Sequence, residues 1–95
     1  MTAARKIRIR EVGPRDGFQS WPEFIPTERK LEVIRLLVEA GVQEMETTSF
    51  VSPKAIPQMR DAAEVLAGVP RTGCIHSPLV PNLKGATLAL ESGAD

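Results

Sequence analysis

Cysteine is nearly absent from this sequence, because Cys74 is the only one among 95 residues. A single cysteine cannot form an internal disulfide, so nothing indicates an oxidising compartment and we expect the cytoplasm. Long apolar runs are missing too, and without about 18 consecutive apolar residues the chain has no candidate for a membrane span. The first residues pass directly into an apolar alternation, which leaves no room for the apolar core of a signal peptide.

Net charge is also lacking, since 12 basic and 12 acidic side chains cancel. A neutral chain has no electrostatic attraction to nucleic acid or to an anionic membrane, so we expect neither as a partner. What is present is the composition of a folded soluble protein, with 42% apolar and 25% charged residues. A chain of this length suits one small domain, which buries roughly 60–65% of the surface of its unfolded form.

Three stretches carry apolar residues at helical spacing. Each ends at a glycine that can follow a helix, namely Gly41, Gly68 and Gly93. The first and the third also begin at residues suited to an N-cap, Thr27 and Asn82. The second begins near residue 57, and the side chains that we expect it to turn inward are Met59, Ala62, Ala63 and Leu66.

Between these helices the sequence predicts strands around residues 7–12, over 42–50 and near 72–77. Strands separated by helices run parallel and are joined by right-handed crossovers. The predicted fold class is therefore α/β, with three consecutive βα units. Three strands leave open edges and an unclosed helix layer, so we expect residues 1–95 to be the opening part of a (β/α)₈ barrel, which needs roughly 250 residues. Because such a chain exposes core surface or borrows a partner's, we also expect a homo-oligomer.

Charged side chains gather where the first two predicted strands end. Arg15 and Asp16 follow the first strand, Gly17 is expected to relieve the backbone at the bend, and Glu46 ends the second. The carboxyl ends of parallel strands form the ligand face of such folds, and neighbouring strands lie about 4.8 Å apart, so we expect the three charges to meet. Asp16 and Glu46 are hard oxygen donors that suit Mg²⁺ or Mn²⁺. Arg15 keeps its proton at neutral pH and would stabilise an oxyanion or an enolate.

Other interpretations of these residues stay open. Arg15 and Asp16 could form a surface turn with a local ion pair, and Glu46 could be a solvated strand end. His76 could be a ligand, a general base or a hydrogen-bonded structural residue. Cys74 is interpreted as strand core, because no activating partner is near it in the sequence.

The remaining candidates lie in loops and at helix starts. Lys54, Lys84 and Asn82 could bind phosphate or a carbonyl near a helix N-terminus, or they could be a cap and two solvated lysines. Trp21 and Phe24 follow the charged bend, where they could form a lid or be buried under their own loop.

Three motifs, "EVGPRDGFQ", "ETTSFVSPKAIPQM" and "PNLKG", together resemble the N-terminal part of the hydroxymethylglutaryl-CoA lyase family. The resemblance extends from about Ile7 to Asp95. Its Arg-Asp-Gly-x-Gln core is shared by a wider group of metal-dependent lyases and synthases, where it usually follows Thr-Leu, whereas here it follows Gly-Pro. The resemblance implies a TIM barrel.

The resemblance also implies an activity, the divalent-metal-dependent retro-Claisen cleavage of an acyl-CoA, 3-hydroxy-3-methylglutaryl-CoA, to acetyl-CoA and acetoacetate. Carried over by motif, Asp16 would ligate the Mg²⁺ or Mn²⁺, and Arg15 would stabilise the enolate of the departing acetyl-CoA. Glu46 would lie close to the metal and its bound water. Gln19 and Ser49 would line the substrate pocket.

Several parts of the family's site have no counterpart in residues 1–95: its His-x-His metal pair, its asparagine ligand and its glycine-rich loop with a catalytic cysteine. One carboxylate beside a glutamate is too small a ligand set for a catalytic Mg²⁺, so we expect the chain alone to lack lyase activity. One alternative is a non-catalytic βαβ chain that associates through open sheet edges. Another is a lyase or synthase of the same group that acts on a different 3-hydroxyacyl-CoA.

Overall fold

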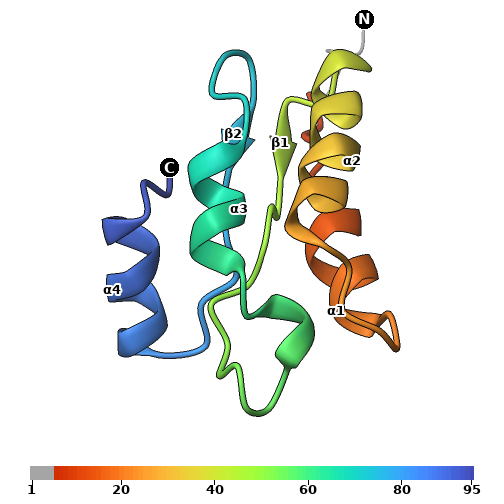
Figure 1. Cartoon of the computed structure of the whole chain (residues 1–95). Coiled ribbons are helices and arrows are strands. Elements are labelled where there is room, and N and C mark those ends of the chain that lie inside the picture. The colour runs from red at the N-terminus through yellow and green to blue at the C-terminus, as the bar shows by residue number, and fades with distance from the viewer. Residues whose placement is uncertain (1–5) are drawn as a thin grey trace, which may run out of the picture.

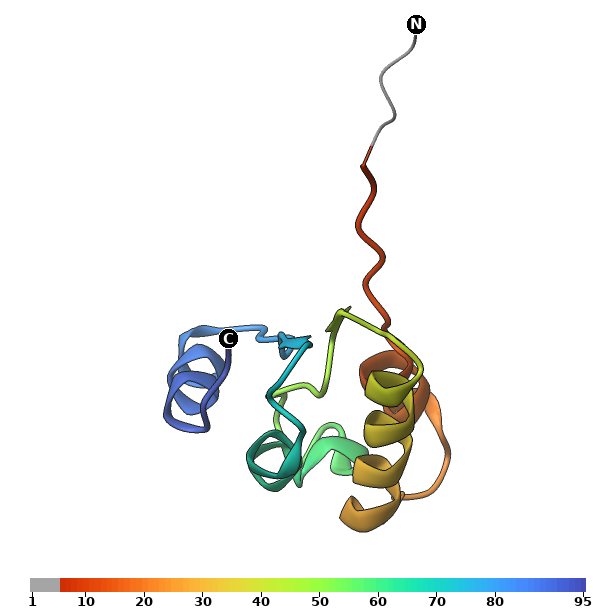
Figure 2. The same cartoon turned by 90° about the horizontal axis from the view of Figure 1, so that it is seen from above.

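The computed structural model describes residues 6–95. Its elements are η1, a π-helical turn (Gly13–Gly17), α1 (Phe18–Ser20), α2 (Thr27–Glu39), β1 (Glu44–Met45), η2, a 3₁₀ turn (Pro57–Met59), α3 (Ala62–Gly68), β2 (Ile75–His76) and α4 (Leu83–Glu91), as Figure 1 shows. Seen from above, α2 and α3 lie on the same side of the two strands (Figure 2). The chain therefore forms a helix layer against one face of a small sheet.

The two strands are parallel, with Glu44 opposite Ile75 and Met45 opposite His76. Met45 and His76 are fully buried, and Met45 packs in the core with residues of α2 and α3. Ile75 points the other way and is 42% exposed. Since successive side chains of a strand alternate between faces, Glu44 and Ile75 share the second face of the sheet, where Ile75 is exposed and Glu44 is buried.

The expected first strand is not formed. Of residues 6–12 only Glu11 is paired with the sheet, through an isolated parallel bridge to Met45. An alternating segment becomes a strand when its apolar side has a surface to cover. In the described chain Ile7 and Ile9 have none, because they are 81% and 77% exposed. The α/β class with parallel strands is confirmed. The three complete βα units are not, because the described residues contain two strands and, at Glu11, only an isolated bridge in place of the first strand.

Helix α2 ends as predicted and begins differently. Gly41 follows it with φ +102°, in the left-handed region that glycine adopts most easily. At the start, Pro26 is the N-cap residue, so the predicted Thr27 cap is wrong. The Thr27 hydroxyl instead donates a hydrogen bond of 2.6 Å to Asp61 Oδ2. The Thr27 side chain thus bonds to a residue distant in the sequence instead of capping its own helix.

The second predicted helix is divided into η2 and α3 by a turn at residues 60–61. Met59, Ala62 and Leu66 are buried as predicted, but Ala63 is exposed. The break changes which side chains face inward, because α3 begins as a separate helix at Ala62. Gly68 ends α3, as expected.

The core lies between the strands and the helices. Its buried apolar residues are Ile34, Met45, Phe50, Ala62, Val65, Leu66, Val69, Cys74 and Ala89, so Cys74 is a core residue as predicted. The α4 cap is also confirmed, since Asn82 Oδ1 accepts a hydrogen bond of 2.8 Å from Gly85 N. None of the helices in residues 6–95 has the length and apolar character of a membrane span.

Candidate active site

Arg15 joins the two chain segments that carry the predicted site. Its Nε donates a 2.8 Å hydrogen bond to Glu46 Oε1, and its Nη1 lies 3.5 Å from Asp16 Oδ1. The side chains of Arg15 and Glu46 are 22% and 19% exposed, and that of Asp16 is 63% exposed. The expected meeting of the three charges is therefore present. Their catalytic and metal-binding roles stay predictions.

Glu11 builds this juxtaposition, although sequence reasoning did not single it out. Its backbone oxygen accepts from Glu46 N at 2.8 Å, and its side-chain Oε1 accepts from Gly13 N at 2.9 Å. Glu11 thus bonds both to the residue after β1 and to the first residue of the η1 bend. A carboxylate two residues before Gly-Pro was the available signal, because such a side chain can bond to the backbone of the following turn.

The bend itself is a helical turn and not a strained loop. Arg15 N and Asp16 N both bond to Val12 O, at 3.1 and 2.7 Å. Gly17 has φ −64° and ψ −47°, which any residue adopts. The expectation that Gly17 relieves the backbone is therefore wrong, because Gly13–Gly17 is a helical turn, with Pro14 near its start, that needs no left-handed residue.

The donor set for a cation is incomplete. Asp16 presents an exposed carboxylate, whereas the Glu46 carboxylate is occupied by Arg15. No group of three or more His, Cys, Asp or Glu side chains in residues 6–95 is arranged to hold a metal ion. Asp16 fits the role of one ligand, and this part of the chain supplies no full coordination shell.

Gln19 and Ser49 bring buried polar atoms that lack partners. Within the described chain no hydrogen bond reaches Gln19 Oε1 or Ser49 Oγ, although both atoms are buried, and Ser49 has no exposed surface. A buried polar atom left unpaired costs about 1–3 kcal/mol, and such atoms are rare in native structures. Both belong to the segments that carry Arg15 and Glu46, and their role in lining a substrate pocket stays a prediction.

The expected common cavity around the charged residues is not one of the three cavities described on residues 6–95. Three cavities of about 490, 400 and 470 Å³ open on the described chain, and none has Arg15, Asp16 or Glu46 in its lining.

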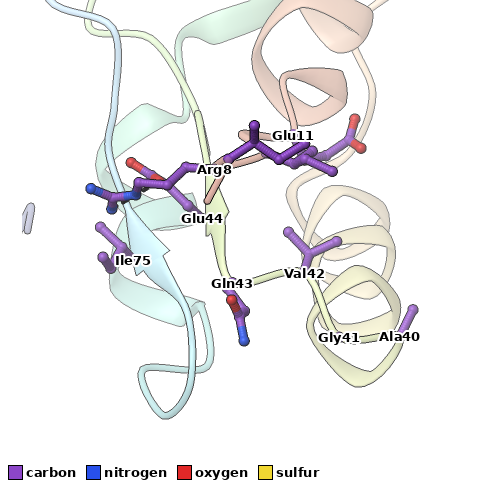
Figure 3. A pocket seen from close by; sticks show the side chains of 10 residues that line it. Arg8, Glu11, Ala40, Gly41, Val42, Gln43, Glu44 and Ile75 are labelled. Carbon is purple, nitrogen blue, oxygen red and sulfur yellow. Dashed lines mark ion pairs between the residues drawn. The ribbon is translucent and has the colours of Figure 1, made fainter. Parts of the chain in front are cut away.

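The largest of these cavities lies near the start of β1, where Arg8 and Glu44 face each other (Figure 3). Glu44 is held by Arg10 at 2.9 Å and by Arg8 at 3.0 Å, and the hydrogen bond from Arg10 is the main cause that lowers the pKa of this carboxyl. Both arginines are mostly exposed, at 74% and 52%, so the pairs contribute little to stability. This cluster follows from the alternation in residues 7–10 and was not predicted.

His76 is a structural residue, as one of its interpretations held. Its Nδ1 lies 2.8 Å from Thr47 Oγ1 and its Nε2 lies 2.6 Å from Pro70 O. A carbonyl only accepts, so Nε2 carries the proton and Nδ1 accepts from the threonine hydroxyl. Burial is the main cause that lowers the pKa of His76, and burial likewise raises the pKa of the Cys74 thiol. Both environments favour the neutral forms.

The loop after the bend is held in place by one hydrogen bond and two cation–π contacts. Gln58 Nε2 donates to Trp21 O at 2.9 Å, and the centroid of the Phe24 ring lies 4.6 Å from Lys30 Nζ and 3.7 Å from the Arg60 guanidinium. Trp21 is 56% exposed and Phe24 is half-buried. This packing favours a fixed loop over a mobile lid. Of the other candidates, Lys54 and Lys84 are exposed.

The family model for HMGL-like proteins matches residues 6–95. The chain belongs to the HMGL-like family. Mitochondrial hydroxymethylglutaryl-CoA lyase of Homo sapiens is 48% identical over 94 residues, which are 98% of this chain and 29% of the human protein. A hydroxymethylglutaryl-CoA lyase of Bacillus subtilis is 47% identical over 94 residues, 98% of this chain and 31% of its own length.

Solved structures of HMGL-like proteins have the same fold over this segment. The HMG-CoA lyase of Brucella melitensis superposes with a TM-score of 0.91 at 44% identity, covering 97% of this chain and 33% of its own. An HMG-CoA lyase of Acinetobacter baumannii, in complex with coenzyme A and 3-methylmalate, gives a TM-score of 0.87 at 46% identity, covering 92% of this chain and 29% of its own. The chain thus spans about a third of the relatives that it matches.

Proposed function

We propose that this chain is the opening part of a TIM-barrel lyase that cleaves 3-hydroxy-3-methylglutaryl-CoA to acetyl-CoA and acetoacetate. The observation that carries the proposal is the Arg15–Glu46 contact of 2.8 Å beside Asp16, at the ends of neighbouring segments of a parallel sheet. Membership of a family whose relatives are named hydroxymethylglutaryl-CoA lyases supports the substrate. The coenzyme A bound by one relative supports an acyl-CoA as the partner.

Arg15 acts on the charge that the reaction creates. When the substrate's 3-hydroxyl loses its proton, the C2–C3 bond breaks, C3 becomes the ketone of acetoacetate and the electron pair moves into the thioester enolate. Protonation of that enolate yields acetyl-CoA. A guanidinium that is always charged stabilises the enolate oxygen and cannot serve as the base. Glu46 holds Arg15 through Nε and Asp16 lies 3.5 Å from its Nη1, so Nη2 would be the nitrogen that faces the substrate.

Asp16 would be one ligand of a divalent cation, Mg²⁺ or Mn²⁺. When bound, such an ion polarises the oxygens of the substrate and orients them. Asp16 is suited to this role because its carboxylate is exposed and makes only a long contact with Arg15, at 3.5 Å. Glu46 would stay near the ion and its water without leaving Arg15.

Gln19 and Ser49 would contact the substrate. Their buried oxygens have no partner in the described chain, and a polar acyl group is a partner of the right kind. The 95 residues by themselves would not turn over substrate, because one free carboxylate cannot retain a catalytic cation against water.

A chimera tests this function. Residues 6–95 replace the matched segment of the Bacillus subtilis relative, and cleavage of 3-hydroxy-3-methylglutaryl-CoA is followed with Mg²⁺. We expect turnover by the chimera and none by the 95-residue chain. Asp16→Asn should lower kcat by about 10²–10³-fold, whereas Arg8→Ala, at the opposite end of the strands, should leave it unchanged. A folded chimera that binds the metal and does not cleave the substrate would contradict the proposal.

A further inference from the structure

The 3₁₀ turn η2 lies between the two segments that carry Gln19 and Ser49. On one side it packs against α1, the short helix that contains Gln19, and in Figure 1 it is the green turn just before α3. On the other side Met59 Sδ accepts a hydrogen bond of 3.8 Å from Thr48 Oγ1, and Thr48 directly precedes Ser49. One turn therefore touches both segments.

Gln58 connects this turn to the end of α1. Its Nε2 donates a hydrogen bond of 2.9 Å to Trp21 O, and Trp21 is the C-cap residue of α1. The helix has only three residues, and the hydrogen bond from Trp21 N back to Phe18 O is long, at 3.4 Å. Because so short a helix has little stability of its own, its place depends on contacts from outside it.

The backbone of Gln58 is itself fixed from behind. Lys30 Nζ donates a hydrogen bond of 2.6 Å to Gln58 O and lies 2.6 Å from Asp61 Oδ1. Lys30, Met59 and Asp61 are all buried. Moving this backbone would leave a buried ammonium with one acceptor fewer, which is costly. The Gln58 side chain therefore reaches Trp21 from an anchored position.

Gln19 is the residue whose placement depends on this contact. Its buried Oε1 has no partner in the described chain, and a hydrogen bond to a substrate weakens steeply when the two atoms are misaligned. The charged residues Arg15 and Asp16 are held separately, because their backbone N–H groups bond to Val12 O. Substrate contact by Gln19 and charge stabilisation by Arg15 thus have different supports.

We propose that Gln58 is a positioning residue, which sets where Gln19 meets the acyl group of the substrate, and that η2 is the rigid support from which it acts. The proposal deepens the proposed function and rests on it, since it concerns the same site. Loss of the Gln58 donor should weaken substrate binding and leave the chemical step intact. Such a change raises KM and leaves kcat nearly unaltered.

Two matched substitutions in the chimera with the Bacillus subtilis relative test this role. Gln58→Met keeps the length of the side chain and removes the donor, and Gln43→Met makes the same change at an exposed glutamine at the opposite end of β1. Gln58→Met should raise KM for 3-hydroxy-3-methylglutaryl-CoA about 3–10-fold and change kcat by less than about 2-fold. Gln43→Met should leave both unchanged.

A double variant separates positioning from a general loss of structure. Gln19→Met should raise KM by at least as much as Gln58→Met. If Gln58 acts through Gln19, the double variant should be no worse than Gln19→Met alone, because residues that share one interaction are not additive. A merely structural role of Gln58 would add its own effect to that of Gln19.

A second measurement follows position without activity. Trp21 is the single tryptophan of the chain, so 5-fluorotryptophan gives the 95-residue protein one fluorine resonance. Gln58→Met should shift or broaden this resonance, because it frees the Trp21 oxygen, and Gln43→Met should not.

Three results would each overturn the positioning role: additive effects on KM in the double variant, a loss of kcat at unchanged KM, or a fluorine resonance that Gln58→Met leaves unmoved. A chimera with native Gln58 that binds the metal and does not cleave the substrate counts against the proposed function instead. In that case a moved resonance still supports the placement of α1 by Gln58, and an unmoved one overturns it, so the two failures are distinguishable.

Discussion

Lys30 and Asp61 form a buried ion pair that connects α2 to the turn before α3. Lys30 Nζ lies 2.6 Å from Asp61 Oδ1, and the two residues are 1% and 6% exposed. Lys30 also donates to Gln58 O at 2.6 Å, and the second Asp61 oxygen accepts from Thr27 at 2.6 Å. Each charge therefore has hydrogen-bonding partners, which a buried pair needs to offset its desolvation.

Removing one partner of this pair should destabilise the fold strongly. Asp61→Ala leaves the Lys30 ammonium buried without its counterion, and such changes cost about 3–5 kcal/mol. Urea unfolding followed by circular dichroism measures the free energy of unfolding. The matched control is Glu32→Ala, which removes an exposed pair with Arg29 at 3.7 Å and should cost less than about 1 kcal/mol. Equal effects of the two substitutions would show that the Lys30 site is solvated.

Arg15 should matter for activity more than for stability. In the chimera with the Bacillus subtilis relative, Arg15→Ala should lower kcat by about 10²–10³-fold, because it removes the cation that meets the enolate. The free energy of unfolding should change by about 1–3 kcal/mol, since the Arg15–Glu46 hydrogen bond is partly buried, with side chains 22% and 19% exposed. A large loss of stability with unchanged kcat would assign Arg15 a structural role.

His76 should make stability depend on pH near neutrality. Burial lowers its pKa below the ordinary value of about 6.5, so between these two values the unfolded chain binds a proton that the folded chain does not. Stability should therefore be complete above pH 6.5 and fall as the pH drops below it, by up to about 1.4 kcal/mol per pH unit. The measurement is urea unfolding between pH 5 and 7.5.

His76→Gln is the control for that pH dependence, because the variant has no histidine left to titrate. The titration of Glu44 does not affect this comparison. Its pKa is lowered, so the stability that it contributes is lost only below its ordinary value of 4.5. A pH dependence that persists in the glutamine variant would assign the effect to another group.

Two glycines should respond to alanine in opposite directions. A Cβ at Gly85 would lie 2.8 Å from the backbone oxygen of Phe50, so Gly85→Ala should destabilise by about 1–3 kcal/mol. A Cβ at Gly17 would meet nothing within 4 Å, and its φ of −64° suits any residue, so Gly17→Ala should be neutral or stabilise by about 0.4–1 kcal/mol. Thermal unfolding of both variants compares them, and a stabilising Gly85→Ala would show that α4 moves freely away from Phe50.

Local patterns predicted the elements whose causes are local. Gly41 and Asn82 end and begin helices through their own backbone and side-chain geometry, and both were predicted. The meeting of Arg15 with Glu46 was predictable as well, because strand ends in a parallel sheet share one edge. Glu11 was missed, since its role depends on bonding to β1 and to the η1 turn at the same time.

The sequence by itself determined the order of helices and strands, the parallel pairing of β1 and β2, and the segments that carry the charged site, because periodicity and turn residues act over a few positions. Only the tertiary structure decided the partners of Thr27 and Lys30, which bond to Asp61 more than thirty positions away. It also decided that residues 7–10 do not form a strand, since a strand needs a neighbour to pair with and a surface to cover, and no local pattern supplies either.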